Sequence, residues 1–141
     1  MPMTGIAGLN DAPQVVDDWL EELCHDLQWR EKARAYALLH ETLHAIRDVL
    51  SVTEAADLAA QLPVLVRGIF FEGWSPSGTP VMAGEKADLR NRIEARFADD
   101  PLEDPDRAIA AVFDLLRRHV SSGTSGPMDA MQRPVSPRVW H

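Results

Sequence analysis

The sequence has a single cysteine, no long apolar run and few basic residues, and each shortage excludes a class of protein. Cys24 has no second cysteine with which to form an internal disulfide, which is typical of a chain in a reducing compartment. No stretch approaches the roughly 18 apolar residues of a transmembrane helix, and the N-terminus lacks the basic and apolar regions of a signal peptide. We therefore expect a cytoplasmic protein with no membrane partner.

The shortage of positive charge argues against nucleic acid as a partner. The chain has 14 Lys and Arg against 22 Asp and Glu, and its formal net charge is −8. A nucleic-acid footprint needs a basic stripe, whereas these cations are scattered along the sequence. The one adjacent pair, Arg117 and Arg118, falls near the end of a predicted helix, where cations complement the helix dipole.

What the sequence does have is helical periodicity over most of its length. Asp11 and Pro13 are start signals, Ser51 and Glu54 fit a capping box, and Asp104 and Pro105 fit the start of a last strong helix. These signals predict helices from about residue 13 to 27, 30 to 50, 51 to 61, 63 to 73, around 89 to 97 and from 105 to about 121, with a loop over residues 74–84. The fold class is therefore all-α, a helical bundle.

The apolar positions of these helices predict the core. In each helix they recur at spacings of three and four residues, so that they lie on one face. We expect burial of Val15, Val16, Trp19, Leu20, Leu23, Leu27, Tyr36, Leu39, Leu43, Ile46, Leu50, Leu65, Val66, Ile69, Phe70, Leu89, Ile93, Phe97, Ile109, Val112, Phe113, Leu116 and Val120.

The two halves of the chain form a degenerate tandem repeat with a period of about seventy residues. Three stretches correspond in the same order: Trp19, Leu23 and Leu27 with Leu89, Ile93 and Phe97; Arg34 to Tyr36 with Arg107 to Ile109; and Gln61, Pro63, Val64 and Arg67 with Gln132, Pro134, Val135 and Arg138. The predicted organisation is a flexible N-terminus (1–12), a first helical repeat (13–74), a linker loop (75–84) and a second repeat with an eroded tail (85–141). Each repeat alone would expose an apolar face, and the two together can close one core.

From about Asp17 to Trp140 the chain resembles the bacterial DUF2267 family of domains of unknown function. The resemblance rests on AYALLHETLHAIRDVL, AAQLPVLVRGIFFEGWSPSGTP and DPDRAIAAVFDLLRRHVSSG, of which the second is the most specific. It implies an all-helical, internally repeated cytoplasmic domain and marks no catalytic or binding residue.

The most chemical motif is His40-Glu41-Thr42-Leu43-His44, an H-E-x-x-H on a predicted helix. Histidines four residues apart share a helical face and can bind one zinc ion, while Glu41 could act as general base toward a metal-bound water. A zinc hydrolase needs a third ligand, and none stands out downstream. We therefore expect no catalytic residues, no metal and no cofactor, with both histidines at the polar border of the Leu39 and Leu43 stripe. A zinc-dependent hydrolase is the alternative.

The aromatic segment at the end of the first repeat is the other candidate site. Phe70, Phe71 and Trp74, flanked by Arg67 and Glu72, precede a Gly-Pro-rich turn that the second half does not repeat. Packing of this cluster into the core is one interpretation, with Phe70 against Trp74 and Gly73 as helix cap. The other interpretation is that these residues bind a protein partner or floor a small-ligand pocket. A homo-oligomer is also possible, with no residues assigned to it. We thus predict a non-enzymatic interaction or regulatory module, with a small-ligand site at the repeat junction as a further alternative.

Overall fold

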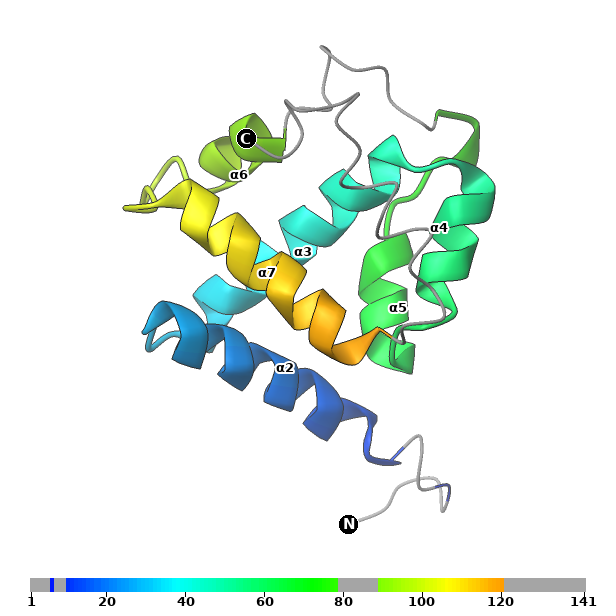
Figure 1. Ribbon diagram of the computed structural model, residues 1–141, viewed down its shortest axis with the longest axis horizontal. Helices are drawn as coiled ribbons and strands as arrows, with labels where there is room; N and C mark the ends of the chain where they lie inside the picture. Colours follow the sequence, from blue (N-terminus) through cyan, green and yellow to red (C-terminus); the bar gives the residue numbers. More distant parts are fainter. Residues whose placement is uncertain (1–5, 7–9, 79–88, 121–141) are drawn as a thin grey trace.

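The computed structural model describes residues 6, 10–78 and 89–120, and these residues form an all-α bundle without strands (Figure 1). The described helices are α2 (Ala12–Leu27), α3 (Lys32–Val49), α4 (Val52–Ala59), α5 (Val64–Phe71), the 3₁₀ turn η1 (Pro76–Gly78), α6 (Leu89–Arg96) and α7 (Pro105–His119). The all-helical prediction is confirmed. Among the described residues, no helix is both long enough and apolar enough to cross a membrane.

Local sequence signals account for where these helices begin and end. The capping box at α4 is present: the Glu54 amide donates to Ser51 Oγ at 3.1 Å, and the Ser51 amide donates to Glu54 Oε1 at 3.0 Å. The Asp104 carboxylate caps α7 by accepting from the Arg107 amide at 3.1 Å. Helix α2 ends at Gln28, whose left-handed φ of 57° is uncommon for a residue with a side chain.

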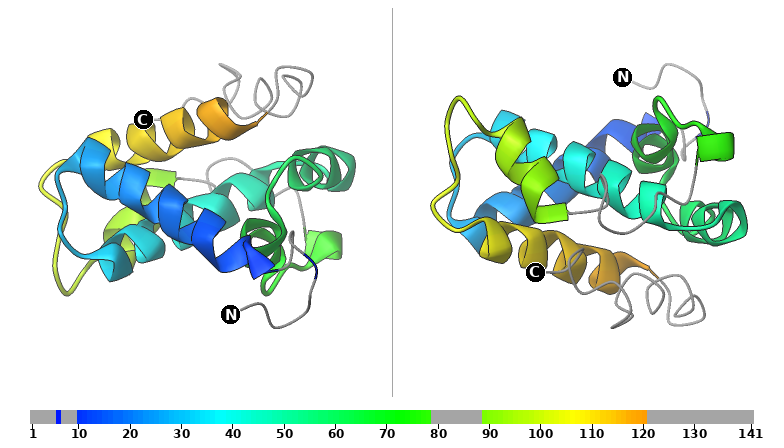
Figure 2. Two further views of the ribbon diagram at one scale, coloured as in Figure 1. Left: turned by 90° about the horizontal axis from the view of Figure 1, so that it is seen from below. Right: turned by 90° about the horizontal axis from the view of Figure 1, so that it is seen from above.

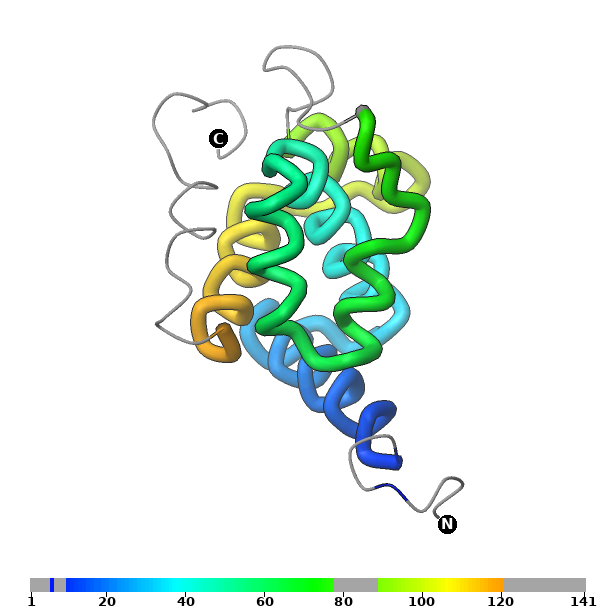
Figure 3. The backbone as a smooth tube through the Cα atoms, turned by 90° about the vertical axis from the view of Figure 1, so that its right-hand side faces the viewer, coloured from blue at the N-terminus to red at the C-terminus, as the bar shows by residue number. Residues whose placement is uncertain are grey.

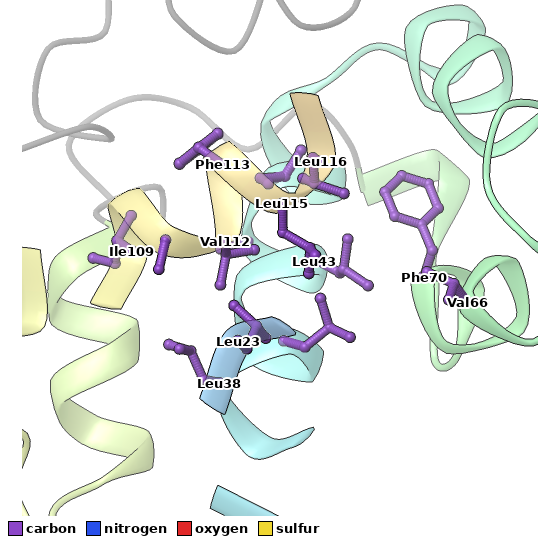
Figure 4. Close-up of a cluster of buried hydrophobic side chains, with 14 of the residues drawn as sticks. Leu23, Leu38, Leu43, Val66, Phe70, Ile109, Val112, Phe113, Leu115 and Leu116 are labelled. Carbon is purple, nitrogen blue, oxygen red and sulfur yellow. The ribbon is translucent and has the colours of Figure 1, made fainter. Parts of the chain in front are cut away.

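Helices from one half of the chain pack on helices from the other half and hold the bundle together. We call this arrangement the exchange of helix partners. Helix α2 packs on α7, and α3 packs on α6 and α5, as the views in Figure 2 show. The core between them is one continuous cluster, and Figure 4 shows Leu23 of α2, Leu43 of α3 and Leu115 of α7 turned toward one another. Helices α4 and α5 form an antiparallel hairpin along one side of the bundle (Figure 3).

Two arginines at matching positions of the proposed repeat form hydrogen bonds from one half of the chain to the other. Arg34, near the start of α3, donates to Asp100 Oδ2 and to the Asp100 carbonyl, each at 3.0 Å. Arg107, near the start of α7, donates to the Asp26 carbonyl at 2.9 Å. Each half thus reaches the end of the other half's first helix. This arrangement is what a two-fold relation between the halves would give, and the repeat itself stays a prediction because its last segment, residues 132–138, lies outside the described residues.

Most of the predicted core residues are buried, but two predictions were wrong. Tyr36 is 39% exposed, because α3 turns Ala35, Leu38 and Leu39 inward instead. Leu65 is 43% exposed, because α5 buries Val66 and Phe70 and faces solvent with the residues on its opposite side. Smaller differences concern α5, which begins one residue later than expected, with Pro63 as its N-cap. The linker residues 79–84 and the tail lie outside the described part of the chain.

Candidate functional site

The two histidines of the H-E-x-x-H motif meet a carboxylate from another helix. His40 and His44 lie four residues apart on α3, with ring centroids 4.2 Å apart. Glu72 follows the last residue of α5 as its C-cap, and its Oε1 is 2.7 Å from His40 Nε2. One ligand atom from each of the three side chains lies within 4.8 Å of the others. Two imidazoles and one carboxylate are therefore gathered at the α3–α5 junction.

The hydrogen bond of His44 determines where its lone pair lies. His44 Nε2 is 2.7 Å from the Ile69 carbonyl oxygen. A carbonyl can only accept, so Nε2 carries the proton and donates, which leaves the lone pair on Nδ1 of the neutral ring. Burial lowers the pKa of His44 from 6.5, the Ile69 bond opposes this shift, and Arg47 and His40 add to it. His44 is accordingly neutral near pH 7.

Arg47 holds the end of α5 in place. Its side chain is buried, and Nη1 donates to the carbonyls of Phe70 at 3.1 Å and of Glu72 at 2.8 Å. The last carbonyls of a helix lack intrahelical partners, so these bonds satisfy groups that would otherwise be stranded. Arg47 lies about one helical turn after His44 on α3. Its bond to the Glu72 carbonyl therefore fixes the backbone of Glu72 relative to α3.

Glu41 is engaged elsewhere. Arg92 of α6 contacts Glu41 Oε2 through Nε at 3.1 Å and Nη2 at 3.0 Å, and its Nη1 donates to Asp48 Oδ2 at 2.9 Å. Asp48 also accepts from Arg47 Nε at 2.8 Å. Glu41 therefore belongs to a charged network that joins α3 to α6, in which its carboxylate is neutralised by a guanidinium rather than directed at a metal-bound water.

Arg67 connects the two helices of the α4–α5 hairpin. Its Nε donates to the Ala59 carbonyl at 2.9 Å and its Nη2 to the Leu62 carbonyl at 3.0 Å. These carbonyls belong to the last residue of α4 and to the turn that follows it. The guanidinium therefore caps α4, and Arg67 has an architectural use within the chain.

The aromatic residues lie mostly against the core. Phe70 is fully buried, and the rings of Phe71 and Trp74 pack at a centroid distance of 4.9 Å, so the partner of Trp74 is Phe71. Trp74 is half-buried, and among the described residues its buried Nε1 has no hydrogen-bond partner. Gly73 has the left-handed φ of 70° that lets the chain turn after α5. The aromatic segment thus offers little free apolar surface.

An exposed apolar surface that was not predicted from the sequence lies on the side of α5 opposite the buried Val66 and Phe70. Val64 is 46% exposed and Leu65 43% exposed, and Gly68 follows one turn later. A Cβ placed on Gly68 would meet no described atom within 4 Å, so the space beside it is open. We call Val64, Leu65 and Gly68 the outer face of α5.

A cavity of about 510 Å³ lies where the α2–α3 turn meets the loop between α6 and α7. Trp29, Arg34 and Arg107 line it together with acidic residues of the loop. Arg34 is used by the chain itself, because it bonds to Asp100 and lies 5.2 Å from the centroid of Trp29. No residue of the aromatic segment lines this cavity, so the small-ligand site predicted at the repeat junction stays a prediction. Within the cavity, both Nη atoms of Arg34 already donate to Asp100 or Pro101.

A comparison with known protein families gives a match over most of the chain. The sequence model of DUF2267, described as an uncharacterized conserved protein, matches residues 16–128. No curated protein matches the chain.

Proposed function

The chain belongs to the DUF2267 family, and we propose that it acts as a non-catalytic module that binds a helix of another protein through the outer face of α5. Gly68 is the observation that carries this proposal. A glycine within a helix costs about 1 kcal/mol relative to alanine. Neither a positive φ nor a neighbouring described atom gives the monomer a use for glycine at this position. Close approach of a partner helix would supply one, since glycine lets two backbones come near each other.

The surroundings of Gly68 favour an apolar contact. Val64 and Leu65 precede it by about one helical turn, so their side chains flank the glycine on the same side of α5. An amphipathic helix can place its apolar stripe on such a surface, with a large side chain over the glycine. Binding through the exposed Val64 and Leu65 side chains would remove their apolar area from water. The removal of apolar area from water is the main driving force of such association.

The charge of the chain favours a different protein over a second copy as the partner. The formal net charge is −8, so two copies would repel each other, while a basic helix would be attracted. We therefore infer a partner helix with an apolar stripe and flanking Lys or Arg residues.

The surroundings of Glu41 support a non-catalytic role. General-base catalysis by an H-E-x-x-H glutamate requires a carboxylate that can accept a proton from a metal-bound water. The two contacts from Arg92 occupy Oε2 of Glu41 and pair this carboxylate with a guanidinium on α6.

Site-specific photo-crosslinking in the native host tests the interaction. A photoreactive amino acid replaces Gly68 in one variant and Ala110, an exposed alanine on α7, in the matched control. We expect an adduct from position 68 that maps by mass spectrometry to an amphipathic segment with basic flanks. The same adduct should be weaker by tenfold or more from position 110.

Three outcomes would contradict the proposal: no adduct at position 68, equal adducts at both positions, or an adduct only to a second copy of the chain. Position 68 is a better probe than Trp74, because Trp74 packs on Phe71 and its removal would disturb the core.

A further inference from the structure

We propose that His40, His44 and Glu72 bind one divalent transition-metal ion, with Zn²⁺ as the best-fitting case, and that this ion links α3 to α5. The site is independent of the proposed partner, because it lies at the C-terminal end of α5 and uses none of the residues of the outer face. Its role would be structural or regulatory.

The three side chains supply a donor set that suits such an ion. Imidazole nitrogen combined with one carboxylate oxygen is typical of zinc and its neighbours, whereas calcium and magnesium take oxygen ligands. Histidines at positions i and i+4 of a helix share one face, and here the rings are 4.2 Å apart. Glu72 supplies a third ligand from the end of α5, and its Oε1 is already 2.7 Å from His40 Nε2.

The surroundings of these ligands resemble the outer shell of a metal site. Ligating histidines usually donate their second ring N–H to a carbonyl or a carboxylate, and His44 makes this bond to the Ile69 carbonyl. Glu72 is fixed through its backbone by Arg47, so its carboxylate needs little rearrangement to bind. Glu72 and His40 already contact each other at the point where an ion bound by both would lie.

Access and charge also fit the proposal. The Glu72 side chain is 64% exposed and that of His40 27% exposed, so an ion can enter from solvent and keep a water as its fourth ligand. The donor set carries one negative charge, which leaves a bound Zn²⁺ partly uncompensated. With Glu41 held by Arg92, that water has no general base beside it in the described arrangement.

Metal titration of the tag-free, metal-stripped full chain tests the site. Isothermal titration with zinc chloride should give one equivalent bound with micromolar or tighter affinity, and His40→Ala and Glu72→Gln should each weaken it by tenfold or more. Glu72 is exposed, so Glu72→Gln should fold like the parent chain, as circular dichroism can verify. His25→Ala, which removes an exposed histidine beside Cys24 on α2, is the matched control and should bind normally.

Cobalt supplies a second readout that reports the ligand type. Co²⁺ in the site should show visible d–d absorption without the thiolate charge-transfer band that Cys24 would give. The proposal is overturned if no stoichiometric binding occurs, if His40→Ala and Glu72→Gln leave the affinity unchanged, or if binding is lost in His25→Ala. Because the crosslinking experiment uses residues of the outer face, failure of one proposal leaves the other standing.

Discussion

At the scale of single residues, Gly68 should lower the stability of the chain while it favours binding of the proposed partner helix. The backbone conformation of Gly68 is available to any residue, and a methyl group at this position would meet no atom of the described residues within 4 Å. Gly68→Ala should therefore raise the free energy of unfolding by about 0.5–1 kcal/mol, because alanine loses less backbone entropy in a helix. Urea denaturation followed by circular dichroism measures the change.

Ala110→Gly is the reverse substitution at an exposed position of α7 and should lower the free energy of unfolding by a similar amount. If Gly68→Ala destabilises the chain instead, the glycine has a use within the monomer, and the argument for a partner at this position fails.

The sequence singled out His40 and His44 but could not identify Glu72 as their neighbour. A spacing of four residues on one helix is enough to predict that two histidines share a face. Glu72 lies 28 residues beyond His44, on another helix, and its approach depends on how the α4–α5 hairpin folds back along α3. Glu41 shows the same difficulty, since its pairing with Arg92 joins residues 51 positions apart. Contacts of this kind follow from packing, which local spacing does not encode.

At the level of elements, we expect α4 to depend on its N-terminal cap. It has eight residues, fewer than an isolated helix needs for stability in water. The Ser51 and Glu54 bonds satisfy two of the amides that begin the helix. Ser51→Ala should lower the free energy of unfolding by about 1 kcal/mol.

Thr53→Ala is the control for Ser51→Ala, because Thr53 is the exposed neighbour that makes no cap bond. Thermal unfolding of the two variants side by side should show a melting temperature several degrees lower for Ser51→Ala alone. Equal melting temperatures would mean that the cap contributes little to the stability of the chain.

Helix ends could be predicted where the sequence contains a cap, as at Ser51 and Asp104, but the buried side of α5 could not. Its residues VLVRGIFF are apolar nearly all round, so periodicity does not distinguish the inner side from the outer one. The tertiary contacts of Val66 and Phe70 determine which side of α5 is buried, and Leu65 is left exposed to solvent. Tyr36 was misassigned for a related reason: α3 is covered by four other helices, and its small Ala35 fits where a stripe of large residues was expected.

At the scale of the whole molecule, the described helices should unfold as one unit. The buried apolar residues form a single cluster that draws on α2 through α7. Fluorescence of the four tryptophans of the chain and circular dichroism should therefore give coincident urea transitions. A fragment of residues 1–78 should show no cooperative transition, because it lacks the helices on which α2 and α3 pack.

Two non-coincident transitions of the full chain would show that its halves are separate folding units. A cooperative transition of the 1–78 fragment would show the same for the first half. Either result would assign the exchange of helix partners a minor energetic role.

The exchange of partners between the halves also has a consequence for synthesis on the ribosome. When α2 and α3 emerge, the surfaces that α6 and α7 will cover are still apolar and exposed, and they stay so until residue 120 has left the exit tunnel. Exposed apolar helices are the kind of surface that chaperones hold and that aggregates grow from. The nascent first half is therefore the form of this protein with the greatest need of protection, and a translation pause in the stretch before Leu89 would prolong that need.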